Sequence, residues 1–156
     1  MNAHWIICVG EQWNGYSTST IKPDALKRIQ RDWSGSLSFD MSGMFGGYSY
    51  RRMRELGFRY GHGANCLGPG MKWDDAIAAR VASELLDLRM KAYILCGQRV
   101  WKAFGCSKML EWHYDEEADA FLLPVPHPSP RCPTWRKPGV IELARQRAVE
   151  LANHTE

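Results

Sequence analysis

The stretch Ala92-Tyr93-Ile94-Leu95-Cys96-Gly97 decides the fold of this chain, because it is a continuous apolar run that stops at a glycine. Such a run without alternation is typical of a strand that is buried on both faces of a sheet. Apolar residues spaced three or four apart predict a helix over residues 74–91, and a short helix is expected over residues 98–104. The stretch is therefore predicted to be a buried strand between two helices.

The rest of the chain repeats this alternation of apolar runs and helical patterns. The other expected strands are residues 5–9, 58–66 and 121–125, the other expected helices are residues 23–33, 50–56 and 139–152, and residues 34–49 and 112–119 are expected to be a loop and a polar connector. This order predicts one domain over residues 1–156. Its fold class is α/β, a three-layer α/β/α sandwich around a short, mainly parallel four-stranded sheet.

The composition is that of an ordinary globular protein. Hydrophobic residues make up 45% of the 156 residues and charged residues 24%, and the formal net charge of +3 permits a nucleic-acid partner without requiring one. No apolar run is long enough to span a bilayer and the first residues do not resemble a signal segment, so we expect a cytoplasmic monomer. The five cysteines include no C-x-x-C pair, which argues against a disulfide framework, a zinc ribbon or a metal cofactor.

Chemically capable side chains follow the expected strands. Parallel sheets bind ligands beyond the carboxyl ends of their strands. Glu11 and Gln12 end the first strand, Asn65 lies near the end of the second, and His127-Pro128-Ser129-Pro130-Arg131 follows the last. The prolines restrict the backbone of the last stretch and hold His127 and Ser129 in extended geometry. We expect these groups to converge on one site, although a plain surface turn would also suit two prolines.

Four short motifs, in this order along most of the chain, resemble those of the uracil-DNA glycosylase superfamily. The stretch at residues 7–11 is similar to the motif in which a strand delivers a water-positioning loop, and Ser38-Phe39-Asp40-Met41-Ser42-Gly43 is similar to the segment that stacks on an extruded base. Asn65 resembles the asparagine that reads the pairing edge of the base. His127-Pro128-Ser129-Pro130 resembles the last motif and is the most specific of the four.

The resemblance implies a DNA glycosylase, which flips a base out of the duplex and hydrolyses its N-glycosidic bond. Phe39 would then stack on the base, Asn65 would read it, and a neutral His127 would stabilise the base as it leaves with negative charge. Arg131 occupies the place of an apolar wedge in relatives, and Ser129 could hold a flanking phosphate. The remaining residues of the expected DNA-facing rim are Trp135, Arg136 and Lys137.

The chain departs from the pattern of the superfamily at two places. Gln12 stands where strongly active relatives have an aspartate. Either Glu11, our first choice, or Asp40 then supplies the carboxylate that activates water, or the reaction relies on water positioning and charge stabilisation alone. Asn14 and its glycine neighbour fall where classical members have a tyrosine that excludes 5-substituted pyrimidines. We therefore expect the target to be uracil or, as we favour, a bulkier modified pyrimidine such as those of modified viral DNA. The N-terminal cysteine pair of the iron–sulfur members is missing, so no cluster is expected.

Two other functions fit the same residues. A non-catalytic module that binds DNA or a flipped base is favoured by Gln12, and a hydrolase of free nucleosides or nucleotides would need neither Arg131 nor Trp135. Structural roles are open as well: Asn65 as a turn amide, Phe39 as loop packing, the cations as a solvated edge, and Trp135 as a cover of the core.

Overall fold

The computed structural model describes residues 3–12, 36–38, 48–67, 72–129 and 131–154, and the described residues form one six-stranded sheet. The strands are β1 (Ile6–Gln12), β2 (Ser36–Ser38), β3 (His62–Leu67), β4 (Ala92–Cys96), β5 (His113–Asp115) and β6 (Ala120–Val125). Their order across the sheet is β2-β3-β1-β4-β6-β5, in which β3, β1, β4 and β6 are parallel and the two edge strands are antiparallel to their neighbours. The predicted α/β sandwich is confirmed.

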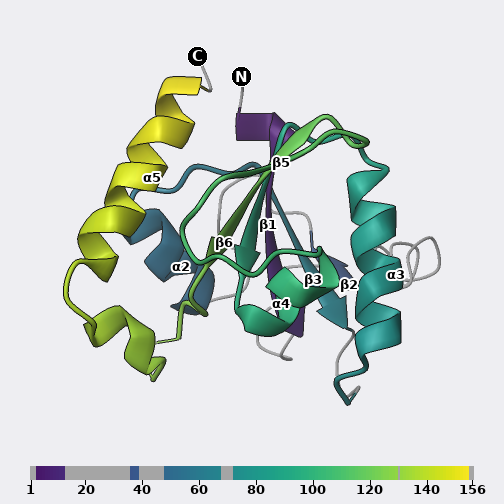
Figure 1. The fold of residues 1–156 in the computed structure, drawn as a ribbon, viewed down its shortest axis with the longest axis horizontal. Helices are drawn as coiled ribbons and strands as arrows, with labels where there is room; N and C mark the ends of the chain where they lie inside the picture. Colours follow the sequence, from purple (N-terminus) through teal and green to yellow (C-terminus); the bar gives the residue numbers. More distant parts are fainter. Residues whose placement is uncertain (1–2, 13–35, 39–47, 68–71, 130, 155–156) are drawn as a thin grey trace.

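Helices cover both faces of the sheet, which gives the three layers seen in Figure 1. α2 (Tyr48–Glu55) and α5 (Val140–His154) pack on one face, and α3 (Asp75–Leu86) and α4 (Gln98–Ala103) pack on the other. Two short 3-10 helices complete the described elements, η1 (Ala3–Trp5) and η3 (Pro133–Arg136). None of the helices in the described ranges combines the length and apolar character that crossing a membrane requires.

Strand β4 shows why a continuous apolar run becomes a central strand. All five of its residues are buried. Ile94 contributes to the core beneath α2 and α5, whereas Tyr93 and Leu95 contribute to the core beneath α3 and α4. Because successive side chains of a strand point to opposite faces, a strand between two helical layers must be apolar at every position.

The predicted helix over residues 74–91 is too long, since α3 ends at Leu86. Its start matches the expected one, because the Asp74 side chain accepts a hydrogen bond from the backbone N–H of Ile77 at 3.0 Å and caps the helix. Arg89 then adopts a left-handed φ of 59°, which turns the chain into β4. The hydroxyl of Tyr93 donates to the carbonyl oxygen of Leu85 and so pairs one of the last helical carbonyls.

The prediction of four strands is also incomplete. β2 lies in the expected loop and β5 in the expected polar connector. Both have only three residues and lie at the sheet edges, so neither is long enough to show a pattern of apolar residues that predicts a strand. β3 begins at His62 rather than at residue 58, and the predicted helix over residues 23–33 lies outside the described residues.

The topology fixes where a ligand would bind. β3 and β4 lie on opposite sides of β1, and the helix that precedes β3 packs on one face whereas those that precede β4 and β6 pack on the other. The direction of winding therefore reverses between β1 and β4. Such a reversal opens a crevice at the carboxyl ends of the two strands.

Candidate functional site

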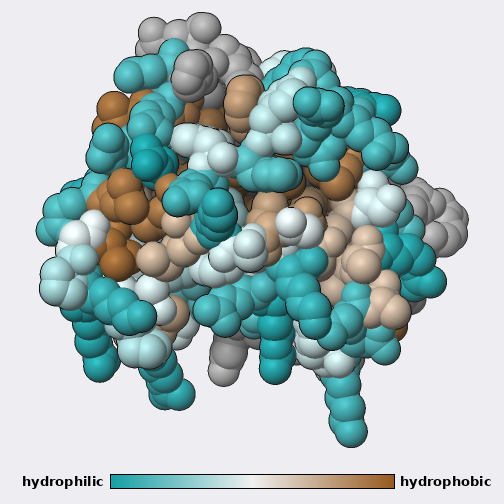
Figure 2. All heavy atoms as spheres, viewed as in Figure 1, coloured by the Kyte–Doolittle hydropathy of each residue, from teal (hydrophilic) through white to brown (hydrophobic). Residues whose placement is uncertain are grey.

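An open cleft of about 810 Å³ lies at this reversal. Its described lining comes from the ends of three parallel strands: Glu11 from β1, the residues after β4 starting with Gly97, and the loop after β6 that contains His127, Ser129 and Arg131. The volume falls within the range of small-molecule sites. Figure 2 shows hydrophilic side chains along the lower edge of the molecule, where these strands end.

Glu11 and His127 face one another across the cleft floor. The distance between His127 Nε2 and Glu11 Oε2 is 4.0 Å, and the two side chains are 40% and 28% exposed. This distance exceeds a hydrogen bond, and both groups remain accessible to a ligand.

Gly97 lies beside both of these side chains. A Cβ atom at Gly97 would meet Glu11 Oε1 and His127 Cδ2 at 3.4 Å each, and the φ of Gly97 is +101°. Both the close approach and the positive φ favour glycine at this position. The strand end that defines the fold therefore also makes room for the two polar groups of the site.

The orientation of the His127 ring is fixed by its own loop. The backbone N–H of Ser129 donates to His127 Nδ1 at 3.1 Å, so in the neutral ring we infer that the proton is carried by Nε2, the nitrogen that faces Glu11. The Ser129 hydroxyl oxygen accepts from the backbone N–H of Arg131 at 3.2 Å, which leaves the hydroxyl hydrogen for another acceptor. The loop thus presents an N–H and an O–H donor.

Two buried tryptophans hold the backbone of the site. The indole N–H of Trp135 donates to the carbonyl oxygen of His127 at 2.7 Å. The indole N–H of Trp101 is shared between the carbonyl oxygens of Leu95 and Val125, at 2.9 Å each. These bonds link the carboxyl ends of β4 and β6, and the loop that contains His127, to the hydrophobic core.

The thiol of Cys66, which is influenced by the charge of Glu11, is unreactive. Burial, and after it the negative charge of Glu11, raises the pKa of Cys66 to about 12. Burial also raises the pKa of Cys8, whose Sγ lies 3.5 Å from that of Cys96. A thiol rather than a thiolate is a poor nucleophile, so these buried cysteines serve packing.

The structure brings most of the described candidates together. The predicted site residues that line the cleft are Glu11, His127, Ser129, Arg131 and Lys137. Asn65 is 3% exposed and pairs in register with Gly10, and strand alternation directs its side chain to the face of α2 and α5. It is not among the described residues that line the cleft. Arg136 is exposed but does not line it either.

One prediction is wrong. Trp135 is 4% exposed and packs in the core beneath α2 and α5, so its ring does not belong to an exposed rim for DNA. Its position holds the loop instead, as described above. Other candidates cannot be placed: Phe39, Asp40 and Asn14 lie outside the described residues, and for Gln12 only the backbone at the end of β1 is described.

Sequence reasoning missed several residues of the cleft, among them Gly97, Arg99 and Trp101. The signal for Gly97 was its position directly after a parallel strand, the same rule that selected Glu11 and His127. Within the described ranges, no group of three or more His, Cys, Asp or Glu side chains is arranged to hold a metal ion. Comparison of the chain with models of protein families finds no match, and comparison with curated proteins finds no relative.

Proposed function

We propose that this protein is a monofunctional DNA glycosylase of the uracil-DNA glycosylase superfamily, which hydrolyses the N-glycosidic bond of a flipped base and leaves an abasic site. The observation that carries the proposal is the pair of Glu11 and His127, which face each other at 4.0 Å with Gly97 beside both. A carboxylate and an imidazole N–H on one cleft floor are the two groups that this reaction uses.

His127 acts on the leaving base. When the bond between C1′ and the base nitrogen breaks, its electron pair stays with the base and appears as negative charge on a carbonyl oxygen. The Nε2–H of His127 donates to that oxygen, because Nδ1 already accepts from Ser129. A donor fixed before the reaction stabilises the developing charge without a reorganisation cost.

Glu11 acts on the sugar and the water. Its carboxylate orients a water molecule toward C1′, takes the proton when the new C–O bond forms, and favours the positive charge of the sugar in the transition state. The proton then passes to the released base, which restores the enzyme. Glu11 lines the cleft beside His127, and a carboxylate can take the proton of the water, which the amide of Gln12 cannot.

The surroundings of the pair suit a nucleic acid. Arg131 and Lys137 are exposed at the rim of the cleft, and Ser129 offers its hydroxyl hydrogen. Cations and hydroxyls of this kind contact phosphates and repay the cost of unstacking a base, which is about a few kcal/mol. We propose a monomer that acts on cytoplasmic DNA, in repair or in defence against modified viral DNA, with uracil or a bulkier 5-substituted pyrimidine as the target.

The test is the detection by mass of any base released from single- and double-stranded oligonucleotides that contain uracil or 5-substituted pyrimidines. We expect release by the unaltered protein, loss of release in His127→Ala, and no change in His113→Ala, which alters an exposed histidine of β5 outside the cleft. DNA binding without any release would identify a binding module instead. Release from free nucleosides that is insensitive to Arg131→Ala would identify a nucleoside hydrolase. Efficient release of uracil alone would overturn the bulkier target.

A further inference from the structure

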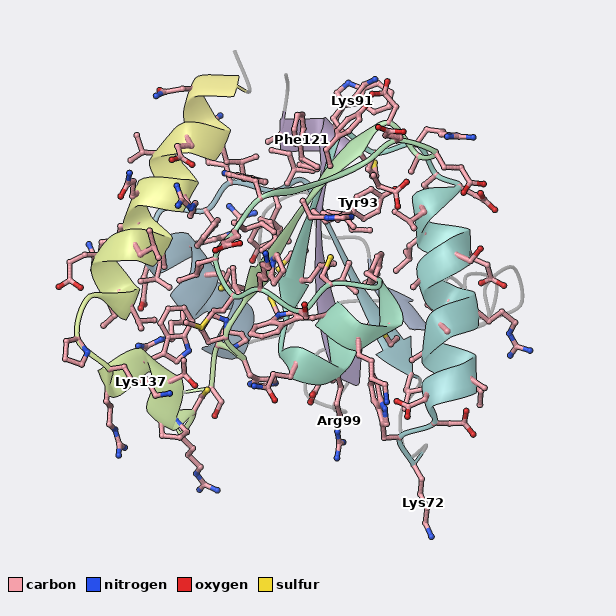
Figure 3. The ribbon with its side chains drawn as sticks, viewed as in Figure 1. Lys72, Lys91, Tyr93, Arg99, Phe121 and Lys137 are labelled. Atoms are coloured by element: carbon pink, nitrogen blue, oxygen red, sulfur yellow. The ribbon has the colours of Figure 1, made fainter. Side chains whose placement is uncertain are left out.

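Arg99 lines the cleft on the side of α3 and α4, opposite the histidine loop. Its Cζ lies 5.5 Å from the ring centroid of Trp73, so the guanidinium is placed over the indole. This arrangement holds the cation through the ring face and leaves the N–H groups at the edge of the guanidinium for another acceptor. Figure 3 shows Arg99 and Lys72 extending from the edge of the molecule where the strands end, and Lys137 to their left in the region of η3.

Trp73 is itself held in place. Its indole N–H donates to Asp75 Oδ1 at 2.9 Å, and Asp75 Oδ2 pairs with Lys102 Nζ at 3.3 Å. The pKa of Asp75 is lowered by the hydrogen bond from Trp73 first and then by Lys102, so this carboxylate stays charged. Asp75 therefore pairs with Lys102 and orients Trp73. Arg99 also attracts the charge of Asp75, more weakly than Lys102 does, and within the described part of the chain it has no ion pair within 4.0 Å.

We infer that Arg99, held on Trp73, binds a backbone phosphate of DNA on the α3 and α4 side of the cleft. The inference deepens the proposed function, because it takes DNA as the ligand. Arg131 and Lys137 line the other side, so the DNA strand is held by cations on both sides of the nucleotide that enters. A planar guanidinium with several donors matches the oxygens of a phosphodiester.

The experiment measures the affinity of the full chain for a fluorescein-labelled, unmodified DNA duplex at several salt concentrations between about 50 and 200 mM. The variants are Arg99→Ala, Trp73→Ala and, as the matched control, Arg80→Ala, an exposed arginine of α3 that does not line the cleft. Thermal unfolding of each variant confirms that it folds.

Arg99→Ala is expected to weaken binding about three- to tenfold. It is also expected to reduce the slope of log affinity against log salt by about 0.9, the value for one lost phosphate contact. Trp73→Ala keeps the charge, so it should weaken binding with little change of slope. Arg80→Ala should change neither quantity.

Identical DNA binding by Arg99→Ala and Arg80→Ala would overturn the proposed contact between Arg99 and a phosphate. Base release is measured separately and decides whether the protein is a glycosylase. A loss of affinity in Arg99→Ala together with no base release from any substrate supports the contact and overturns the glycosylase. Tighter binding of an RNA duplex of the same sequence overturns DNA as the ligand of Arg99. Failure of the unaltered chain to bind any duplex overturns both.

Discussion

Trp135 donates its indole N–H to the carbonyl oxygen of His127 at 2.7 Å, and this bond ties the candidate catalytic histidine to the hydrophobic core. The bond restrains the backbone on one side of the imidazole, and the bond from Ser129 restrains the ring itself. The indole is 4% exposed, so water does not replace the bond when it is lost.

Trp135→Phe keeps an aromatic ring at this position and removes the hydrogen bond to His127, and it also changes the ring over which Arg52 lies. We expect the rate of base release at saturating DNA to fall about tenfold while DNA affinity stays unchanged, and the free energy of unfolding to fall by about 1 to 3 kcal/mol. The matched control is Trp112→Phe, which removes the indole bond to Glu150 Oε2 at 2.9 Å away from the cleft. An equal loss of rate in both variants would mean that Trp135 contributes stability alone.

Gly97→Ala tests the close approach of the site residues. The new methyl group would meet Glu11 Oε1 and His127 Cδ2 at 3.4 Å, in addition to the strain of a φ of +101°. Backbone strain of this kind costs about 1 to 3 kcal/mol. The control is Gly105→Ala, which carries the strain of a φ of +76° with nothing within 4 Å of the added carbon. We expect both variants to lose stability in a denaturant titration, and only Gly97→Ala to lose base release.

Glu11→Gln keeps the shape of the side chain and removes its charge. If the carboxylate activates water, base release falls by about a hundredfold or more and DNA affinity is retained or improves, because a negative charge leaves the cleft. Glu116→Gln, an exposed change in the turn between β5 and β6, serves as the control. Unchanged release in Glu11→Gln would move the role of base to another group, and Asp40 would be the next residue to change.

The buried thiol and phenol groups predict a loss of stability at alkaline pH. Burial raises the pKa of Cys66 and that of Tyr93 to about 12 each, above their ordinary values of 9.0 and 10.0. Above the ordinary values the unfolded chain loses these protons and the folded chain keeps them. Stability is therefore full below about pH 9 and declines toward pH 12, by up to about 1.4 kcal/mol per pH unit for each group.

The measurement is the free energy of unfolding by denaturant as a function of pH. Cys66→Ala should make the decline above pH 9 shallower, because one of the groups that titrates is gone. A Cys66→Ala profile parallel to that of the unaltered protein would show that the thiol does not carry this effect. The same measurement on Cys106→Ala gives the comparison. Cys106 packs at the edge of the core beneath α3 and α4 and is only half-buried, and burial raises its pKa as well, so a smaller change of the profile is expected.

The sequence predicted those features whose burial requires apolar residues at regular positions along the chain. Residues 92–96 and 121–125 became β4 and β6 almost without shift, since a strand between two helical layers must be apolar throughout. The convergence of Glu11 and His127 also followed from the sequence, because both lie at or just beyond the carboxyl ends of parallel strands.

Contacts between distant segments left no such pattern. The role of Trp135 depends on where its indole N–H points, and a tryptophan near a basic loop reads equally well as an exposed ring. The width of the cleft depends on a missing side chain at Gly97, which a sequence records only as a strand end. Arg99, a residue of α4, acquires a defined position through Trp73, which lies in the segment before α3.

The indole N–H of Trp101, which is shared between two carbonyl oxygens, limits how far the cleft can widen when a ligand binds. Any widening between β4 and β6 would separate the carbonyl oxygens of Leu95 and Val125 and break at least one of the two bonds that the Trp101 N–H donates, although Val125 would keep its bond from the backbone N–H of Gly97 at 3.0 Å. The cleft floor between β4 and β6 is therefore rigid and does not change its shape on ligand binding. Selectivity then depends on the ligand, which must adopt a shape that fits the rigid cleft floor.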